Sequence, residues 1–348
     1  MPPFNLETAD EWLNEDAPHA DVIISTRTRY ARNLSQYPFS PRAKSPQLNA
    51  VANEIERALQ QGNIRFFPIL ISELEELERQ YLKESHLISA EMERAGEARV
   101  LYYLSTPGLS ILVNEEDHMR IQCLRAGLRL REALQSLDQL ESQLSRQLNF
   151  AFHERFGYLT ACPTNVGTGL RVSVMMHLPA LVLTNNVEEI LQLLPQYGLT
   201  VRGFYGENSE FLGDFFQISN EVSLGKSEPQ ILEELERVVI QIMDREQHAR
   251  QALFDEKRVK IEDAIWRAYG TLTNSRLISS RDALRQLSHL RLGIGQGIFD
   301  GLNDQQLNRL MIDVQPAHLQ HKEKNPLEEE ERDCARAALL RSRLANQN

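Results

Sequence analysis

The stretch Asp21–Asn33, DVIISTRTRYARN, places three arginines within six residues, directly after an apolar run typical of a β-strand. Side chains of an extended chain alternate between two faces, so Ser25, Arg27 and Arg29 share one face, and Ile24 shares the other with the two threonines. The two guanidinium groups would then lie about 7 Å apart. Such a pair suits a surface that faces a polyanion, because arginine binds phosphate bidentately. Taken alone, the stretch fits an exposed sheet edge at least as well.

The composition is that of a soluble globular protein, with 42% hydrophobic and 25% charged residues in a chain of 348. This length predicts two domains, or one large domain with an appendage. No apolar run approaches the roughly 18 residues that span a bilayer, and the acidic N-terminus lacks a signal pattern. Three widely spaced cysteines indicate a reducing cytoplasm rather than a disulfide framework or a metal site. A net charge of -11 argues against nucleic acid as the partner.

The pattern along the chain divides it into an α+β part and a helical part. Strands are predicted at residues 21–26, 100–105, 109–114, 170–177, 199–206 and 215–220. Helices are predicted at residues 45–62, 116–144 and 185–198. After about residue 226 the spacing is helical throughout, with one long helix or two at 228–270 and further helices at 280–295, 303–314 and 325–347.

Three other segments place an arginine at the end of a strand or loop. Residues 114–120, NEEDHMR, gather three carboxylates and Arg120 at the start of an expected helix, where carboxylates commonly complement only the helix dipole. Residues 162–173, CPTNVGTGLRVS, join a cysteine and a glycine-rich loop to Arg171, and residues 201–207, VRGFYGE, hold an arginine and a glutamate about a tight turn. Four such segments together favour an anion site over a solvated surface.

These segments, in this order, resemble the catalytic domain of the phosphagen kinases and, most closely, the bacterial protein arginine kinases. The matching motifs are NEEDH.RIQCL, CPTNVGTGLR.SVMMHLPALVLT and VRG.YGE.SE, and RDCARA at residues 332–337 is similar to a phosphoarginine-binding motif. The resemblance implies an antiparallel sheet flanked by helices, in a catalytic domain of the glutamine-synthetase-like kind. The expected domains are an N-terminal extension (1–19), the catalytic domain (20–255) and an α-helical C-terminal domain (256–348) that would dimerise.

The resemblance implies transfer of the γ-phosphoryl group of ATP to a guanidinium nitrogen. The chain has no Walker A loop and no HRD or DFG signature, so an arginine cage would position the phosphates and stabilise their charge. Mg²⁺ would be held mainly by phosphates and water, and no protein metal site is expected. By similarity, the ATP site comprises Ser25, Thr26, Arg27, Thr28, Arg29, His86, Arg120, Arg171, Val172, Ser173, Val174, Met175, Arg202, Gly203, Phe204, Tyr205 and Gly206.

The acceptor guanidinium must be oriented and must lose a proton, and two carboxylates can do both. By similarity these are Glu116, the preferred base, and Glu207, whereas Glu115 is a bystander on the motif alone. Cys162 stands at the position of the family's reactive cysteine and would assist, although a cysteine before proline is often only a small buried residue. A structural role is the alternative for His86. Structural roles are expected for Arg32, His118 and His177.

The C-terminal motif and the acceptor leave alternatives open. Arg332 and Arg336 share a helix face and, with Asp333, would bind phosphoarginine as an allosteric site; ordinary pairing of Glu328 with Arg332 is the alternative. Tyr205 replaces an arginine usual in small-molecule kinases, and only 19 residues precede the catalytic domain, which favours arginine on a protein substrate. The rivals are a small-molecule guanidino kinase and a non-catalytic phosphoarginine-binding adaptor. The resemblance further implies a role in stress response, an activator protein, Clp-type protease components and a homodimer.

Overall fold

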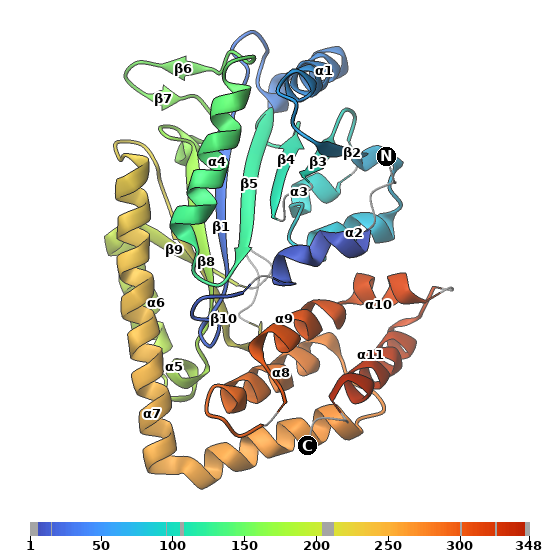
Figure 1. The fold of residues 1–348 in the computed structure, drawn as a ribbon, viewed down its shortest axis with the longest axis vertical. Helices are drawn as coiled ribbons and strands as arrows, with labels where there is room; N and C mark the ends of the chain where they lie inside the picture. Colours follow the sequence, from blue (N-terminus) through green and yellow to red (C-terminus); the bar gives the residue numbers. More distant parts are fainter. Residues whose placement is uncertain are drawn as a thin grey trace.

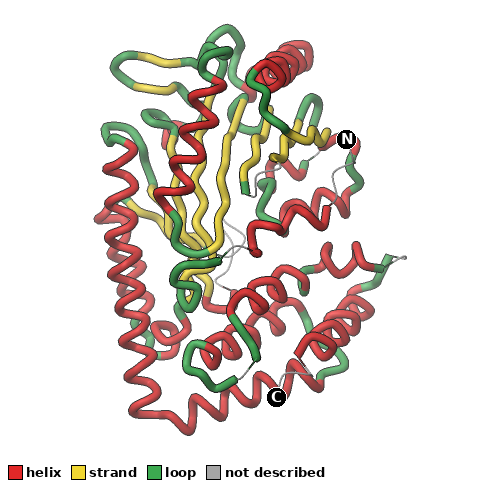
Figure 2. Tube along the Cα trace, in the orientation of Figure 1, coloured by secondary structure: helices red, strands yellow, loops and turns green. Residues whose placement is uncertain are grey.

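The computed structural model describes residues 6–14, 16–94, 96–104, 108–203, 212–299, 301–323 and 326–344. An eight-stranded antiparallel sheet, ordered β2-β3-β4-β5-β1-β8-β10-β9, lies between helices (Figures 1 and 2). The strands are β1 (Ile23–Arg32), β2 (Phe66–Leu70), β3 (Val100–Leu104), β4 (Leu109–Val113), β5 (Met119–Ala126), β8 (Leu170–His177), β9 (Leu199–Arg202) and β10 (Phe215–Asn220), with the separate hairpin β6 (Phe152–His153) and β7 (Gly157–Tyr158).

The helices divide between the two faces of the sheet and a C-terminal group below it (Figure 1). They are α1 (Ser45–Gln61), α2 (Glu76–Glu84), α3 (Ala90–Glu93), α4 (Leu130–Leu144), α5 (Pro179–Leu183), α6 (Val187–Leu193), α7 (Glu228–Asn274), α8 (Ser280–Ile294), α9 (Asp304–Asp313), α10 (Pro316–Lys322) and α11 (Glu329–Leu344). The 3-10 helices are η1 (Leu6–Asn14), η2 (Ser40–Arg42), η3 (Ile71–Glu73), η4 (Pro163–Asn165), η5 (Leu194–Tyr197) and η6 (Leu212–Asp214). In the described part of the chain, none of the helices has the length and apolar character that crossing a membrane requires.

The main core lies on the face of the sheet that α1, α4 and α7 cover. On β1 the buried residues Thr26, Thr28 and Tyr30 alternate with partly exposed ones, as the sequence predicts. Arg32 is buried at this side: its Nε lies 2.9 Å from Oε1 of Glu141, and its guanidinium lies 3.5 Å from the ring centre of Tyr158. The expectation of a structural role for Arg32 is therefore confirmed.

The expectation that Ile24 shares the core face with the threonines is wrong. The pairing of β1 with β8 shifts register between Ile23 and Ser25, which inserts one extra residue. Ile23 consequently lies in the main core, whereas Ile24 packs on the opposite face against a second apolar cluster that contains Leu124 and Met175.

The predicted helix over residues 116–144 is wrong in its first part. β5 occupies that part, between β4 and β1, and only α4 is helical. The reason is a period of two: Met119, Ile121 and Cys123 enter the main core while the residues between them face the other way. Residues 114–118 are therefore the connection between two strands and not a first helical turn.

The strand predictions at 109–114, 170–177 and 215–220 are confirmed, and those at 100–105 and 199–206 are confirmed over Val100–Leu104 and Leu199–Arg202, since residues 105 and 204–206 lie outside the described ones. The strand β2 was not predicted. In the C-terminal part the long helix α7 is continuous except at Lys257, whose φ of -134° breaks the helical geometry. Its first half packs on the sheet through residues such as Leu235 and Val239, and its second half packs with the C-terminal helices. The short helix α10 was not predicted.

A buried polar cluster joins the C-terminal helices to α2 and η1. The carboxylate of Glu84, at the end of α2, accepts hydrogen bonds from the backbone nitrogens of Ala317 and His318 at 3.0 and 3.1 Å. The ring of His318 lies 2.9 Å from Glu84 and 3.2 Å from Asp10, and it stacks on Tyr81. Burial alone would lower the pKa of His318, but the hydrogen bonds and charges of Asp10 and Glu84 outweigh it and raise the pKa.

Because the folded-state pKa of His318 is raised, its contribution to stability is complete below its ordinary pKa of about 6.5 and is lost as the pH rises through the raised value. The melting temperature of the wild type should therefore fall over that window more than that of His318→Gln. Thermal unfolding of both proteins across pH 5.5–9 measures this. Parallel curves for the two proteins would contradict a charged His318.

Candidate functional site

The register of the sheet aligns polar side chains in rows on the face opposite the main core. Residues that pair directly across antiparallel strands point to the same face, so the pairing alone fixes which side chains meet. The rows are Ser25, Met175, Gln217 and Arg202; then Leu124, Arg27, Ser173 and Ser219; then Gln122, Arg29 and Arg171. Arg120 follows in the next row, opposite Ala31. All five predicted cage arginines thus occupy one face.

The arginines on this face lie close enough to repel one another. Burial, together with the charges of Arg120, Arg171 and Arg202, lowers the pKa of Arg27 to about 10. Burial and the neighbouring arginines also lower the pKa of Arg29 well below its usual range. Bringing several cations together in a partly buried place is unfavourable without a compensating anion. The face is therefore suited to a ligand that carries several negative charges.

Glu115 holds one member of this cage in place. Its carboxylate lies 2.7 Å from Nη1 of Arg120 and accepts a hydrogen bond from the hydroxyl of Ser89. Glu115 is buried, whereas the side chain of Glu116 is 39% exposed and lies 3.8 Å from the same arginine. The structure thus gives adjacent glutamates different surroundings, and Glu115 acts by positioning Arg120.

Glu116 and Cys162 lie side by side at the end of the cage. Burial and the charge of Asp117 raise the pKa of Glu116, although the charge of Arg120 and a hydrogen bond with Cys162 oppose the shift. Asp117 accepts hydrogen bonds from Nδ2 of Asn33 at 2.6 Å and from the backbone nitrogen of Ala161 at 2.7 Å. Asp117, which sequence reasoning did not single out, therefore ties the Cys162 loop to the end of β1.

The two other histidines of the motifs have structural roles, as expected. His118 is buried, accepts a hydrogen bond from the backbone nitrogen of Leu34 at 3.0 Å and lies 2.9 Å from the carbonyl oxygen of Pro38. His177 is buried and lies 2.8 Å from the hydroxyl of Ser288. Both predictions are confirmed.

The structure does not bring every predicted ATP residue to this face. The side chains of Thr26, Thr28, Val172 and Val174 are buried on the opposite face, because they alternate with the cage residues along their strands. Only their backbone could meet a nucleotide. Gly203 follows β9 and is buried. Four predicted residues lie outside the described ones: Phe204, Tyr205, Gly206 and Glu207.

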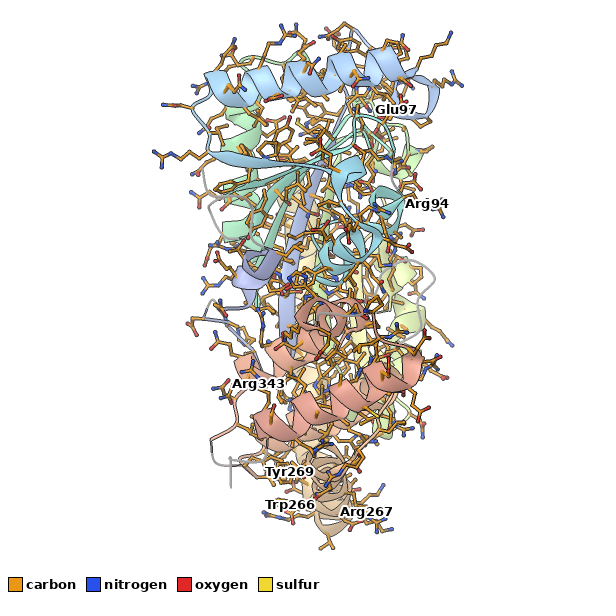
Figure 3. All side chains as sticks on the ribbon, turned by 90° about the vertical axis from the view of Figure 1, so that its right-hand side faces the viewer. Arg94, Glu97, Trp266, Arg267, Tyr269 and Arg343 are labelled. Atoms are coloured by element: carbon orange, nitrogen blue, oxygen red, sulfur yellow. The ribbon has the colours of Figure 1, made fainter. Side chains whose placement is uncertain are left out.

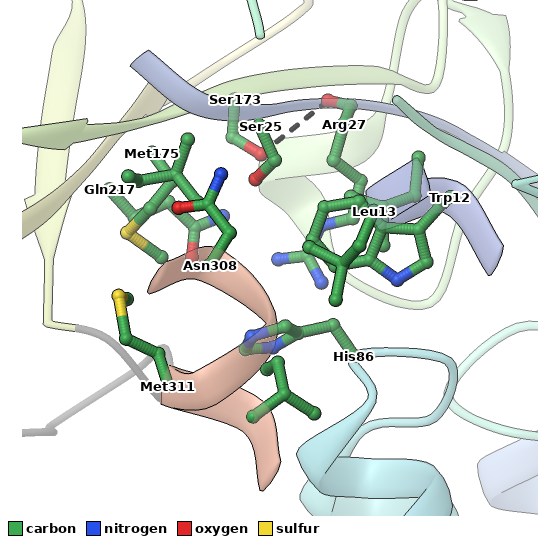
Figure 4. A pocket seen from close by; sticks show the side chains of 13 residues that line it. Trp12, Leu13, Ser25, Arg27, His86, Ser173, Met175, Gln217, Asn308 and Met311 are labelled. Carbon is green, nitrogen blue, oxygen red and sulfur yellow. Dashed lines mark hydrogen bonds between the residues drawn. The ribbon is translucent and has the colours of Figure 1, made fainter. Parts of the chain in front are cut away.

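A small pocket, with a cavity volume of about 30 Å³ and partly open to solvent, adjoins the cage (Figure 4). Five predicted ATP residues line it: Ser25, Arg27, His86, Ser173 and Met175. His86 has a backbone φ of +62°, and burial, together with the charge of Arg27, lowers its pKa to about 4, so its ring is neutral near pH 7. Further lining residues come from outside the motifs, namely Trp12, Leu13, Asn308, Met311 and Ile312. No motif signalled them, because they pack here only after the chain has folded.

The C-terminal RDCARA motif lies on α11 and makes internal contacts. Arg336 is buried and donates to the carbonyl oxygens of Val314 at 2.7 Å and Ile278 at 2.9 Å, as well as to Asp333. Arg332 donates to the carbonyl oxygen of Leu327 at 3.1 Å. Arg336 therefore helps to anchor α11, and phosphoarginine binding at this motif stays a prediction.

Comparisons with known proteins agree with this geometry. The ATP:guanido phosphotransferase C-terminal catalytic domain matches residues 48–249, which defines the class of enzyme. A duplicated taurocyamine kinase from Schistosoma mansoni superposes with a TM-score of 0.61 at 25% identity, over 68% of this chain and 35% of that chain. Lombricine kinase is similar in fold, with a TM-score of 0.59 over 71% of each chain at 24% identity.

The helical region after the catalytic domain matches a more narrowly defined family. The C-terminal domain of the protein-arginine kinase McsB matches residues 258–348. The protein-arginine kinases of Symbiobacterium thermophilum and Bacillus subtilis are 46% and 41% identical to this chain, which covers 96% and 95% of their lengths; the alignments cover 96% and 98% of this chain. The chain therefore belongs to the protein-arginine kinase family of ATP:guanido phosphotransferases.

Two nearby arginines of β1 should respond oppositely to substitution. Arg29→Ala removes a cation from a repelling group, so it should leave the melting temperature unchanged or higher and weaken ADP binding at least about tenfold. Arg32→Ala removes a buried guanidinium that pairs with the partly buried Glu141 and lies over the ring of Tyr158, so it should destabilise the protein by about 3 kcal/mol. Calorimetric binding and thermal unfolding of both variants check this. A destabilised Arg29→Ala with normal ADP affinity would contradict the phosphate cage.

Proposed function

We propose that this chain transfers the γ-phosphoryl group of ATP to arginine side chains of proteins. The observation that carries the proposal is the clustering of five arginines on one face of the sheet, with Glu116 and Cys162 at its end. The family supports the chemistry, and the homology of both parts of the chain to protein-arginine kinases supports the protein substrate. The alternatives of a small-molecule kinase and of a non-catalytic adaptor receive no comparable support.

The cage would bind the phosphates and stabilise the charge of the transferring group. Arg29 and Arg171 pair directly across β1 and β8, and Arg120 is fixed by Glu115, so the positive charges are positioned before ATP arrives. These cations fit phosphate oxygens and not a metal ion. Mg²⁺ would therefore be held mainly by the phosphates and water, and the protein's part is to orient the phosphates.

The acceptor guanidinium would lie at the Glu116 end of the cage. Glu116 would accept N–H groups of the substrate and take the proton as the new N–P bond forms and the bond to the leaving ADP breaks. Cys162 would help to orient the guanidinium from beside Glu116. Glu207 would provide the second carboxylate, as the family motif implies.

Other properties of the family are proposed here as its consequences. We propose a boundary between the catalytic and C-terminal domains at 255/256, close to the break of α7 at Lys257. We also propose a homodimer formed by the C-terminal helices, a phosphoarginine site at RDCARA, and work in the cytoplasm in stress response with an activator and a Clp-type protease.

The adjacent glutamates provide a matched test of the base. Glu116→Gln should lower kcat about 10²- to 10⁴-fold with ATP affinity retained, because it removes the proton acceptor. Glu115→Gln should instead weaken ATP binding, because Arg120 loses its buried partner. Steady-state kinetics and ADP calorimetry separate the two effects. Full activity in Glu116→Gln would show that another group accepts the proton.

The raised pKa of Glu116 also sets the pH dependence. Glu116 acts as a base only when ionised, so kcat should fall as the pH drops through its raised pKa, above the ordinary value of 4.5. A pH–rate profile at saturating ATP measures this. An acidic limb at or below pH 4.5 would contradict the assignment.

The substrate class is tested with the full chain, ATP and either casein or free arginine. Mass spectrometry under non-acidic handling should find phosphoarginine on the protein, with any required activator supplied. Phosphate on free arginine alone would overturn the proposal. Modification of neither acceptor, with ADP bound normally, would favour the adaptor.

A further inference from the structure

The walls of the cavity beside the arginine cage come from separate parts of the chain, among them the loop that carries His86. The sheet contributes Met175 and Gln217, the 3-10 helix η1 contributes Trp12, and the C-terminal helix α9 contributes Asn308 and Met311. Figure 4 shows Met311, Asn308 and Trp12 around the same space as His86 and the guanidinium of Arg27. The cavity beside the cage is therefore enclosed in part by helices outside residues 48–249, the matched catalytic domain.

The amide of Asn308 is held in one orientation. The side chain is buried, and Arg291 donates to its Oδ1 at 2.6 Å. A guanidinium can only donate, so Oδ1 must be the atom it meets and Nδ2 must point elsewhere. Figure 4 shows this nitrogen directed toward Ser25 and Ser173, across the cavity. Asn308 therefore presents a donor to the space beside the cage.

Trp12 supplies a second donor in the same wall. Its side chain is 2% exposed, and its indole Nε1 is buried with no hydrogen-bond partner among the described residues. Buried donors are almost always paired, and an unpaired one costs roughly 1–3 kcal/mol. A ligand with acceptor atoms in the cavity would satisfy Nε1. The ring nitrogens of a purine, or the hydroxyls of its ribose, are such acceptors.

The C-terminal helices also hold the loop that carries His86. Glu84, two residues before His86, accepts both backbone hydrogen bonds from the start of α10. His318 lies 3.4 Å from the hydroxyl of Ser85, between Glu84 and His86. The positive φ of His86 places its ring in the cavity only while this loop keeps its shape. The contacts of Glu84 and Ser85 with α10 thus connect the C-terminal helices to the position of the His86 ring in the cavity.

We propose that the base and ribose of ATP are bound between the sheet and the C-terminal helix α9, with Met311 packed on the base and Asn308 and Trp12 donating hydrogen bonds. The inference rests on the proposed function, which places the phosphates on the arginine cage. It makes the C-terminal helices part of the nucleotide site. Movement of these helices then changes ATP affinity directly.

Trp12 offers a readout that does not depend on activity. Trp266, the only other tryptophan of the chain, is 45% exposed and lies in α7, at the end of the molecule opposite Arg94 and Glu97 (Figure 3). In Trp266→Phe, saturating ADP with Mg²⁺ should change the emission of Trp12 by at least about a fifth, because a purine contacts the ring. In Trp12→Phe, the emission of Trp266 should stay constant.

Inorganic tripolyphosphate separates the base from the phosphates. It should bind the arginine cage and compete with ADP, but leave the emission of Trp12 unchanged, because it has no base. An equal change with tripolyphosphate and ADP would show that Trp12 senses phosphate binding alone, and would overturn the inference.

Two neighbouring residues of α9 provide a matched pair. Met311 and Leu310 are both buried in the same apolar cluster, but only Met311 lines the cavity. Met311→Ala should raise Kd for ADP and KM for ATP about fivefold to tenfold with kcat nearly unchanged. Leu310→Ala should lower the melting temperature and leave Kd and KM unchanged.

Calorimetry of ADP binding distinguishes the two levels of failure. If ADP does not bind the wild type at all, the proposed function fails. Suppose instead that ADP binds the wild type, the emission of Trp12 does not change, and Met311→Ala has the wild-type Kd for ADP. The cage then holds the phosphates, but α9 is not part of the nucleotide site. The latter result overturns this inference alone.

Discussion

Repulsion among arginines on one face of an antiparallel sheet is the constraint on which the site depends. Arg27 and Arg29 stand two residues apart on β1, and Arg171 pairs directly with Arg29 from β8. A flexible surface would let these side chains separate into water, but the paired strands keep their Cα atoms in fixed rows. The sheet therefore holds several positive charges close together, and the negative charges of a polyphosphate reduce the repulsion between them. The acidic net charge of the chain is irrelevant to this local field.

The charged groups around the cage show how that field is kept ordered. Glu115 neutralises one arginine from a buried position, Arg32 is turned to the opposite face and neutralised by Glu141, and Asp117 ties the Cys162 loop to β1 through Asn33. The three acids of NEED thus have different partners: Glu115 positions Arg120, Glu116 lies beside Cys162, and Asp117 anchors a loop.

Much of this arrangement could be predicted from the sequence, for identifiable reasons. The alternation of Ser25, Arg27 and Arg29 follows from strand geometry, and the family motifs supplied the partners on other strands. The strand at Met119–Ala126 was missed because its apolar residues also fit helical spacing when joined to α4. Ile24 was misplaced because a bulge leaves no local sequence signal. Trp12, Asn308 and Met311 could not be found, because only tertiary packing brings residues almost 300 positions apart to one cavity.

Helix α7 links the sheet to the C-terminal helices, so the two regions cannot be separated without exposing apolar side chains. Its first half covers the main core of the sheet, and its second half belongs to the apolar cluster that joins Ile24, Leu124 and Phe215 to the C-terminal helices. A cut near Lys257 would uncover those three side chains and leave the stump of a long helix exposed to water. The sheet and the helices are therefore separable as sequence families but not as folding units. A substitution that alters this apolar surface in the C-terminal helices therefore also changes the packing of the sheet.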